Sequence, residues 1–108
     1  YEKLIRASYN AVSRMKFSKG IPLEITITAL FSIPQSIGKK LKSSMLKNEV
    51  LPTKKPDSDN VIKIILDALN GVCFHDDAQV CRVYFQKKYD EIPRLEIKIR
   101  DMGGLNDE

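Results

Sequence analysis

Residues 55–77 read KPDSDNVIKIILDALNGVCFHDD. An apolar segment begins just after Asp57 and Asp59 and ends shortly before Asp76 and Asp77. Placed on a helix at about 100° per residue, residues 59–70 form a narrow polar ridge beside a wide apolar face. The pattern therefore predicts a mostly buried helix whose ridge faces either solvent or a functional site. The ridge comprises Asp59, Asn60, Lys63, Asp67 and Asn70.

The aspartates around this helix have two interpretations. In the simpler one, Asp57, Ser58 or Asp59 caps the helix and meets the positive end of its dipole. Lys63 is then a surface partner of the aspartates four residues before and after it. This interpretation accounts for one aspartate at the helix start, but it leaves Asp76 and Asp77 without a role.

The second interpretation is a divalent-metal site. Hard ions such as Mg²⁺ prefer carboxylate oxygens, and two or three carboxylates suffice when substrate phosphates complete the shell. Asp57 and Asp59 would come from the helix entrance, and Gly71 would permit the turn that returns the chain. Because successive residues of an extended segment point to opposite sides, we expect only one of Asp76 and Asp77 to face the ions.

Other metal and nucleotide motifs fit less well. The DSDN sequence resembles the start of an EF-hand loop, but Ile62 stands where that loop needs Gly and Ala68 where it needs Glu. His75 with Cys73 and Cys81 has irregular spacing for zinc, and we expect His75 to be a loop side chain. The chain is also too short to build a nucleotide-sugar domain around Asp-x-Asp.

Periodicity outside the central helix predicts the remaining elements. Apolar residues alternate in three segments, which is the period of strands with one buried face. In the second strand Cys81, Val83 and Phe85 share a face. The predicted elements are a helix over 2–16, strands over 21–29, 80–88 and 94–100, a weaker helix over 35–47 and a loop over 48–56.

Two of these elements have further expected features. The third strand is the clearest, because Leu95, Ile97 and Ile99 alternate with charged residues. The weaker helix would turn Ile37, Leu41 and Met45 inward, with a lysine-rich opposite side. Early helices followed by a late hairpin indicate an α+β domain with a small, mostly antiparallel or mixed sheet and helices packed on one face. We expect one domain over 1–108, with 101–108 as a frayed tail.

Composition narrows the protein class. With 108 residues and 43% hydrophobic residues, the chain can bury one modest core. The net charge is +4, and positive charge is concentrated between residues 39 and 55. No apolar run approaches the roughly 20 residues of a membrane span, so we expect a cytoplasmic protein without membrane association. Two cysteines are too few for a disulfide framework, and we expect Cys73 and Cys81 to be reduced and buried.

The segment KPDSDNVIKIILDALNGVCFHDDAQV closely resembles the signature of the RusA family of Holliday junction resolvases, which is common in phages and prophages. The shared features are Asp-x-Asp-Asn, a lysine four residues after the second Asp, Asp-Ala-Leu, a Gly turn and Asp-Asp-x-Gln. The match covers about a quarter of the chain. Family members usually begin with a strand before the first helix, so we expect that an N-terminal strand is missing here.

The resemblance implies a role for each matching residue. Asp57, Asp59 and Asp77 would be the catalytic carboxylates that bind Mg²⁺, for which Mn²⁺ would substitute, and Lys63 would be the catalytic lysine. No organic cofactor is implied. Asn60, Asp67, Asp76 and Gln79 match positions with supporting roles.

The implied reaction is hydrolysis of one phosphodiester in each of two opposed strands of a four-way DNA junction, in DNA recombination and repair. Two symmetric nicks need two sites, so the resemblance implies a homodimer. Two other readings remain: a catalytically inactive, structure-specific DNA-binding protein with the same fold, and an interaction domain with surface acids. The lysine-rich segment would bind backbone phosphates or form a solvated helix face. Its lysines are Lys39, Lys40, Lys42, Lys47, Lys54 and Lys55.

Overall fold

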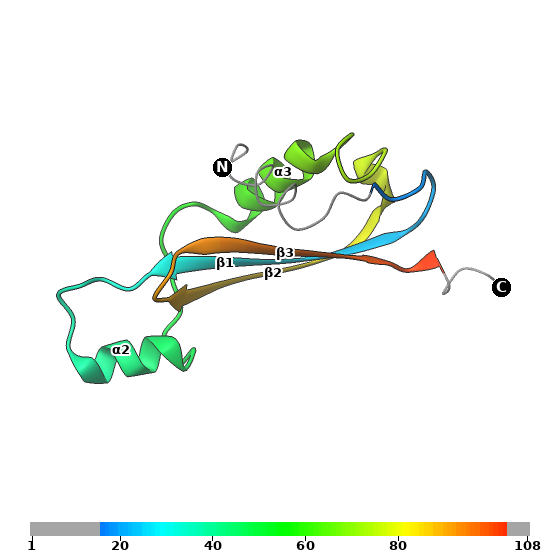
Figure 1. Ribbon diagram of the computed structural model, residues 1–108. Helices are drawn as coiled ribbons and strands as arrows, with labels where there is room; N and C mark the ends of the chain where they lie inside the picture. Colours follow the sequence, from blue (N-terminus) through cyan, green and yellow to red (C-terminus); the bar gives the residue numbers. More distant parts are fainter. Residues whose placement is uncertain (1–15, 104–108) are drawn as a thin grey trace.

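The computed structural model describes residues 16–103 and is built around a mixed three-stranded sheet. Strand β1 (Leu23–Ser32) lies in the centre, with β2 (Val80–Asp90) parallel on one side and β3 (Arg94–Asp101) antiparallel on the other (Figure 1). The α+β class is therefore confirmed, with the sheet of the mixed kind. The predicted helix over 2–16 lies almost entirely outside the described residues.

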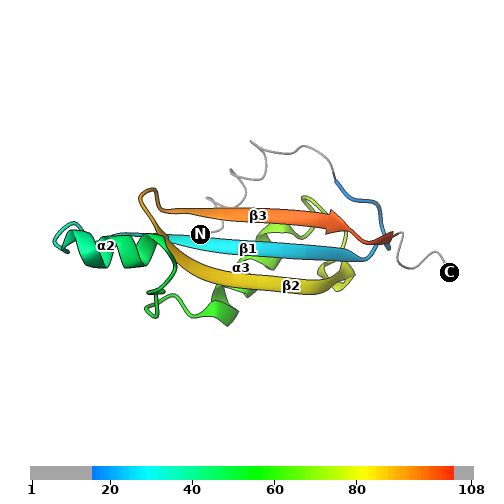
Figure 2. The ribbon, with the colours of Figure 1, turned by 90° about the horizontal axis from the view of Figure 1, so that it is seen from below.

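The late hairpin was a wrong prediction. Strands β2 and β3 follow each other in sequence, but they flank β1 instead of pairing, and residues 91–93 carry the chain past the end of β1. Figure 2 shows β1 between its two neighbours. A short link between two strands favours a hairpin. Here the apolar β1 lies in the centre instead, where both of its edges are hydrogen bonded to neighbouring strands and its inward side chains are fully buried.

Helix α3 (Ser58–Leu69) covers one face of the sheet (Figure 1). Its residues Val61, Ile65, Ala68 and Leu69 are buried, at the helical spacing that the sequence indicated. They belong to one core cluster with the inward residues of β1, while the predicted polar ridge of α3 is exposed throughout. On β1 the inward residues are Leu23, Ile25 and Ile27.

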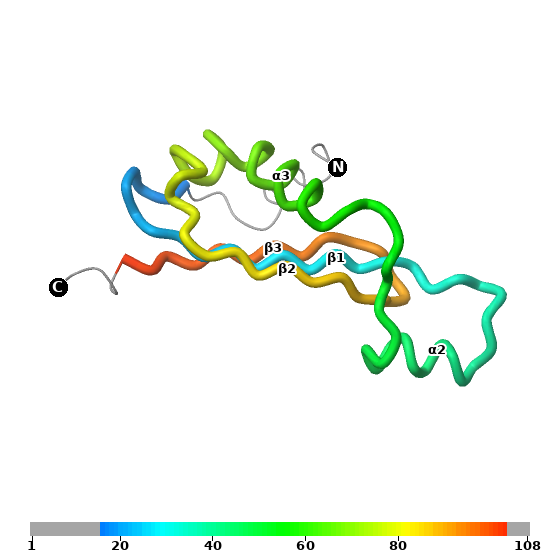
Figure 3. Tube along the Cα trace, turned by 180° about the vertical axis from the view of Figure 1, so that it is seen from behind, coloured from blue at the N-terminus to red at the C-terminus, as the bar shows by residue number. Residues whose placement is uncertain are grey.

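Helix α2 (Lys39–Leu46) lies beyond the end of the sheet and does not join α3 on the covered face (Figures 1 and 3). The prediction of helices on one face holds for α3 alone. Met45 is buried and Ile37 half-buried, as expected, but Leu41 is exposed. A helix with so little apolar surface has no broad face to bury.

The ends of the sheet differ from the expectations in two details. Cys73 is buried and reduced, and burial raises its pKa to about 12, but Cys81 is exposed. A register irregularity where β2 begins leaves Cys81 without a partner on β1, between the pairs Leu23–Val80 and Glu24–Arg82. At the other end, Met102 is buried and its N–H donates to the carbonyl of Pro22, so the expected tail is held to the fold at this position.

Among residues 16–103, the helices are too short and too polar for one of them to cross a bilayer.

Candidate active site

Asp57 and Asp59 lie at the N-terminal end of α3. Asp57 directly precedes the helix in an extended conformation, but its side chain makes no capping hydrogen bond. One oxygen of its carboxylate instead lies 3.2 Å from Nζ of Lys55, and both side chains are exposed. The capping interpretation therefore fails for Asp57. Asp59 is an exposed residue of the first helical turn, where the helix dipole favours negative charge.

Lys63 projects from the middle of the polar ridge. It is exposed, with Asn60 on one side and Asp67 on the other. Within the described part of the chain, no ion pair joins Lys63 to Asp59 or Asp67. The surface-partner interpretation is therefore not supported, and the ammonium group is available to another anion.

The C-terminal end of α3 carries the second pair of carboxylates. Gly71 takes the left-handed conformation, with φ of 78°, and turns the chain back toward β2. Asp76 then precedes a short 3₁₀ helix, Asp77–Gln79, and its Oδ1 accepts the Ala78 N–H at 3.0 Å. Asp77 is exposed at the first position of that helix.

Three carboxylates interact electrostatically at this end. The hydrogen bond from the N–H of Ala78, followed by one with Asp77, lowers the pKa of Asp76. The same contact with Asp76, together with the charges of Asp76 and Asp67, raises the pKa of Asp77. Negative charge is therefore concentrated where the ridge of α3 meets the turn before β2, and a cation placed there would relieve the repulsion.

The structure does not bring all the predicted ligands together in one chain. Asp59 and Asp67 are eight residues apart on one helix, a separation of about 12 Å at 1.5 Å per residue, and Asp77 lies on the Asp67 side. Among residues 16–103, no three His, Cys, Asp or Glu side chains could hold a metal ion together. The donors are nevertheless of the type that Mg²⁺ prefers, and Mg²⁺ often takes only one or two protein carboxylates.

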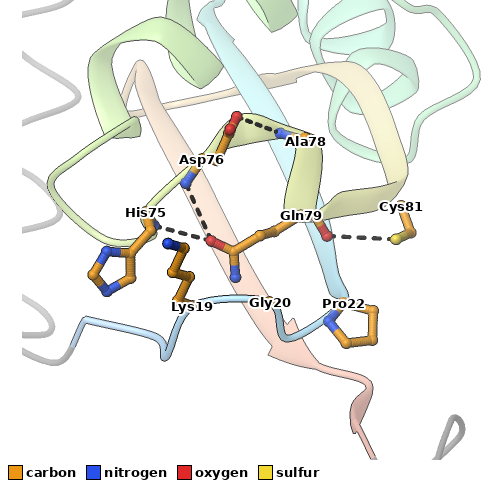
Figure 4. Close-up of a pocket in the computed structure, with 8 residues that line it drawn as sticks. All are labelled: Lys19, Gly20, Pro22, His75, Asp76, Ala78, Gln79 and Cys81. Atoms are coloured by element: carbon orange, nitrogen blue, oxygen red, sulfur yellow. Dashed lines mark hydrogen bonds between the residues drawn. The ribbon is translucent and has the colours of Figure 1, made fainter.

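Gln79 is the best-connected of the four predicted supporting residues. Its side chain is buried and hydrogen bonded to backbone groups on two segments, as Figure 4 shows in part. Asp76 takes part in the same turn, whereas Asn60 and Asp67 are exposed on the ridge.

The six predicted DNA-binding lysines have different surroundings. Lys39, Lys40 and Lys42 project from α2, where Lys42 pairs with Glu91 at 3.2 Å. Lys47 is exposed just after α2, and Lys55 is the partner of Asp57. Lys54 places Nζ above two aromatic rings, at 5.6 and 5.9 Å from their centroids. These rings belong to Phe31 and Tyr89.

Lys87 is a contact residue that the sequence did not single out. Its ammonium group donates to the carbonyls of Lys54 at 2.9 Å and Pro56 at 2.6 Å, directly before Asp57. It therefore ties the entrance of α3 to β2. In the sequence Lys87 is one of two adjacent lysines within a strand, and nothing local distinguishes it from Lys88.

Comparison with known proteins agrees with the motif. A family model described as endodeoxyribonuclease RusA matches residues 1–100. The uncharacterized protein YqaN of Bacillus subtilis strain 168 is 37% identical over 85 residues, and the crossover junction endodeoxyribonuclease rusA of Lactococcus phage r1t is 30% identical over 87. These alignments cover 77% and 80% of this chain but 60% of each relative. The chain therefore spans about 60% of the length of these relatives.

Proposed function

Because the chain belongs to the RusA endodeoxyribonuclease family, we propose that it acts as a Holliday junction resolvase that depends on Mg²⁺. It would make paired symmetric nicks in four-way junctions, on DNA of the cytoplasm, in recombination and repair. The observation that carries the proposal is the set of exposed carboxylates at both ends of α3, with a lysine between them that forms no ion pair within residues 16–103.

The proposed roles follow from the chemistry of these groups. Asp57, Asp59 and Asp77 would hold the cation, which when bound supplies a nucleophilic water and neutralises phosphate charge. Mn²⁺ should substitute, because it also accepts oxygen ligands. Lys63 would place its ammonium group against the scissile phosphate, where negative charge develops in the transition state. Asp76 and Asp67 would increase the negative potential that attracts the cation.

The separation of the carboxylates supports a homodimer. Asp59 lies about 12 Å along α3 from Asp67, whose charge acts on Asp77, whereas the ligands of one Mg²⁺ ion lie about 2 Å from it. Asp57, Asp59 and Asp77 of a single copy would therefore not share one ion. Two copies related by a two-fold axis, with their α3 helices antiparallel, would bring Asp57 and Asp59 of one copy close to Asp77 of the other. Such a dimer has two equivalent sites, as two symmetric nicks require.

The lysines around α2 would bind the DNA backbone outside the site. Lys39, Lys40 and Lys47 are exposed, and no ion pair involves them among the residues described. Their charge would offset the repulsion between an acidic site and DNA, with an affinity that falls steeply as salt rises.

The direct experiment is cleavage of an end-labelled synthetic four-way junction with Mg²⁺, beside a linear duplex of matched sequence. The parent chain should nick the junction at paired symmetric positions and leave the duplex intact. The Asp77→Asn variant should bind the junction without cutting it. Asp90→Asn serves as a matched control, because Asp90 pairs with Arg94 at the far end of β2 and should not affect cleavage.

A junction that is bound but remains uncut under both Mg²⁺ and Mn²⁺ would contradict the proposal. It would favour the alternative of a DNA-binding protein that keeps the fold without catalysis. Absence of any stabilisation by Mn²⁺ in a thermal melt would favour the interaction-domain reading.

A further inference from the structure

Gln79 uses both ends of its side-chain amide. The Oε1 atom accepts the N–H groups of His75 at 3.0 Å and Asp76 at 3.1 Å. The Nε2 atom donates to the carbonyls of Ser18 at 2.9 Å and Ile21 at 3.0 Å. With 8% of its surface exposed, Gln79 is the buried member of an otherwise exposed turn. Figure 4 shows its side chain between the two segments.

These contacts fix the backbone on both sides of Asp77. Asp76 and Gln79 form a reciprocal capping box, in which the Asp76 carboxylate and the Gln79 amide each accept backbone N–H groups of the turn. The N–H of Gln79 also donates to the carbonyl of Asp76. Asp77 lies between these two residues, so their hydrogen bonds fix the backbone from which its exposed carboxylate projects.

The opposite end of the Gln79 amide connects the turn to the central strand. Ser18 and Ile21 lie on the loop that leads into β1, and Leu23 at the start of β1 is fully buried. The turn is thereby joined to the loop that enters the buried central strand. A backbone held in this way limits the positions that the Asp77 carboxylate can take, which favours the binding of a hard cation.

We propose that Gln79 is a positioning residue for the reaction: it holds the turn that carries Asp77 against the loop before β1, so that Asp77 is preorganised as a metal ligand. The inference rests on the proposed function and goes beyond it, because it gives a buried residue outside the acidic site a role in metal affinity. Groups that orient metal ligands typically contribute about 10–100-fold to metal affinity or activity.

If Gln79 only stabilised the fold, its replacement would lower the melting temperature without changing metal binding. Stability and metal binding are therefore measured separately. Gln79→Met keeps the side-chain length but removes all four amide hydrogen bonds. Ile27→Val is a stability control, since it removes one methylene group from the core under α3 and leaves the residues of the turn unchanged. Gln86→Met is the matched control, because it removes a glutamine whose amide donates to Thr28 Oγ1.

The measurements are made at a temperature where circular dichroism shows every variant folded. They are the Mn²⁺ concentration for half-maximal junction cleavage, Mn²⁺ binding by calorimetry, and junction binding in EDTA. For Gln79→Met we expect about 10–100-fold weaker Mn²⁺ binding, a matching rise in the half-maximal concentration and unchanged junction binding. Ile27→Val should lower the melting temperature alone, and Gln86→Met should leave the Mn²⁺ response unchanged.

An unchanged Mn²⁺ response in folded Gln79→Met would overturn the proposal even if the parent chain cleaves junctions. Should Gln79→Met fail to fold, the same measurements are made on Gln79→Glu. This variant keeps the side-chain length and the acceptor oxygen but loses the two donated hydrogen bonds. Weaker Mn²⁺ binding with unchanged junction binding would then support the proposal, and parent-like Mn²⁺ binding would overturn it. A parent chain that neither cuts junctions nor binds Mn²⁺ would refute the proposed function, and this inference with it.

Discussion

The two ends of α3 carry similar carboxylates in different settings. At the C-terminal end, Asp76 and Gln79 close a hydrogen-bonded turn around Asp77, and that turn is fastened to the loop before β1. At the N-terminal end, Asp57 makes no capping hydrogen bond and pairs with an exposed lysine. The backbone that carries Asp76 and Asp77 is thus held by side-chain hydrogen bonds, whereas no such turn holds Asp57 within the described residues.

The loop before α3 is held through its backbone, by the ammonium group of Lys87 on the carbonyls of Lys54 and Pro56. This arrangement fixes the course of the chain up to the helix but does not hold the carboxylate of Asp57, which pairs with the exposed Lys55. Preorganisation is therefore uneven across the candidate site, and substitutions at the two ends of α3 should have different consequences.

The largest expected effect is a loss of stability when a core side chain just after the C-terminal end of α3 is truncated. Phe74 is fully buried in the core and pairs with Asn70 where the chain leaves α3. Phe74→Ala should therefore lower the free energy of unfolding by about 3–5 kcal/mol, measured by urea denaturation. Asn60→Ala, at the exposed N-terminal end, should change it by less than about 0.5 kcal/mol. Equal losses of unfolding free energy in the two variants would contradict this difference between the two ends of α3.

The second-largest expected effect is on the rate of junction cleavage, when the lysine in the middle of α3 is replaced. Lys63→Ala should reduce junction cleavage at least about 100-fold, because it removes a positive charge beside the transition state. Junction binding in EDTA should stay within a few fold of the parent. Lys98→Ala is the control, since Lys98 pairs with Thr26 in the sheet, on the side away from α3. Parent-like nicking by Lys63→Ala would refute the role assigned to this lysine.

A smaller effect should appear in the salt dependence of binding. Replacing Lys39, Lys40 and Lys47 together by Gln should make the plot of log affinity against log salt shallower, by about 0.9 for each DNA phosphate that these lysines no longer neutralise. Fluorescence anisotropy with a labelled junction measures this slope. Lys98→Gln provides the comparison for a lysine outside the segment, and an unchanged slope in the triple variant would exclude these lysines from the DNA interface.

Much of the fold was predictable from periodicity. The wide apolar face of α3 and the alternation of β3 each allow one buried arrangement, and both were confirmed. Strand order was not predictable, because the short link over 91–93 is compatible with a hairpin as well as with a crossing past β1. The register irregularity that exposes Cys81 arises from pairing with β1, which a single strand does not reveal.

The residues of the candidate site come from the motif and stay a prediction, whereas their arrangement in space could not be predicted from the sequence. The motif pointed to Asp57, Asp59 and Asp77 as a set, although the length of α3 places them at opposite ends of a helix. The spacing from Asp76 to Gln79 is itself a signal of a capping box, and it could have indicated the turn around Asp77. The link from Gln79 to Ser18 spans distant parts of the chain and depends on tertiary structure.

Sites shared between two copies are tested most directly by mixing two inactive variants, Asp59→Asn and Asp77→Asn, under conditions that exchange subunits. Cleavage of the junction is then assayed with Mg²⁺. If each site takes Asp59 from one copy and Asp77 from the other, mixed dimers contain one intact site. Random exchange should then restore about a quarter of the parent's sites, seen as single unpaired nicks. No nicking by the mixture, beside an active parent chain, would contradict sites shared between two copies.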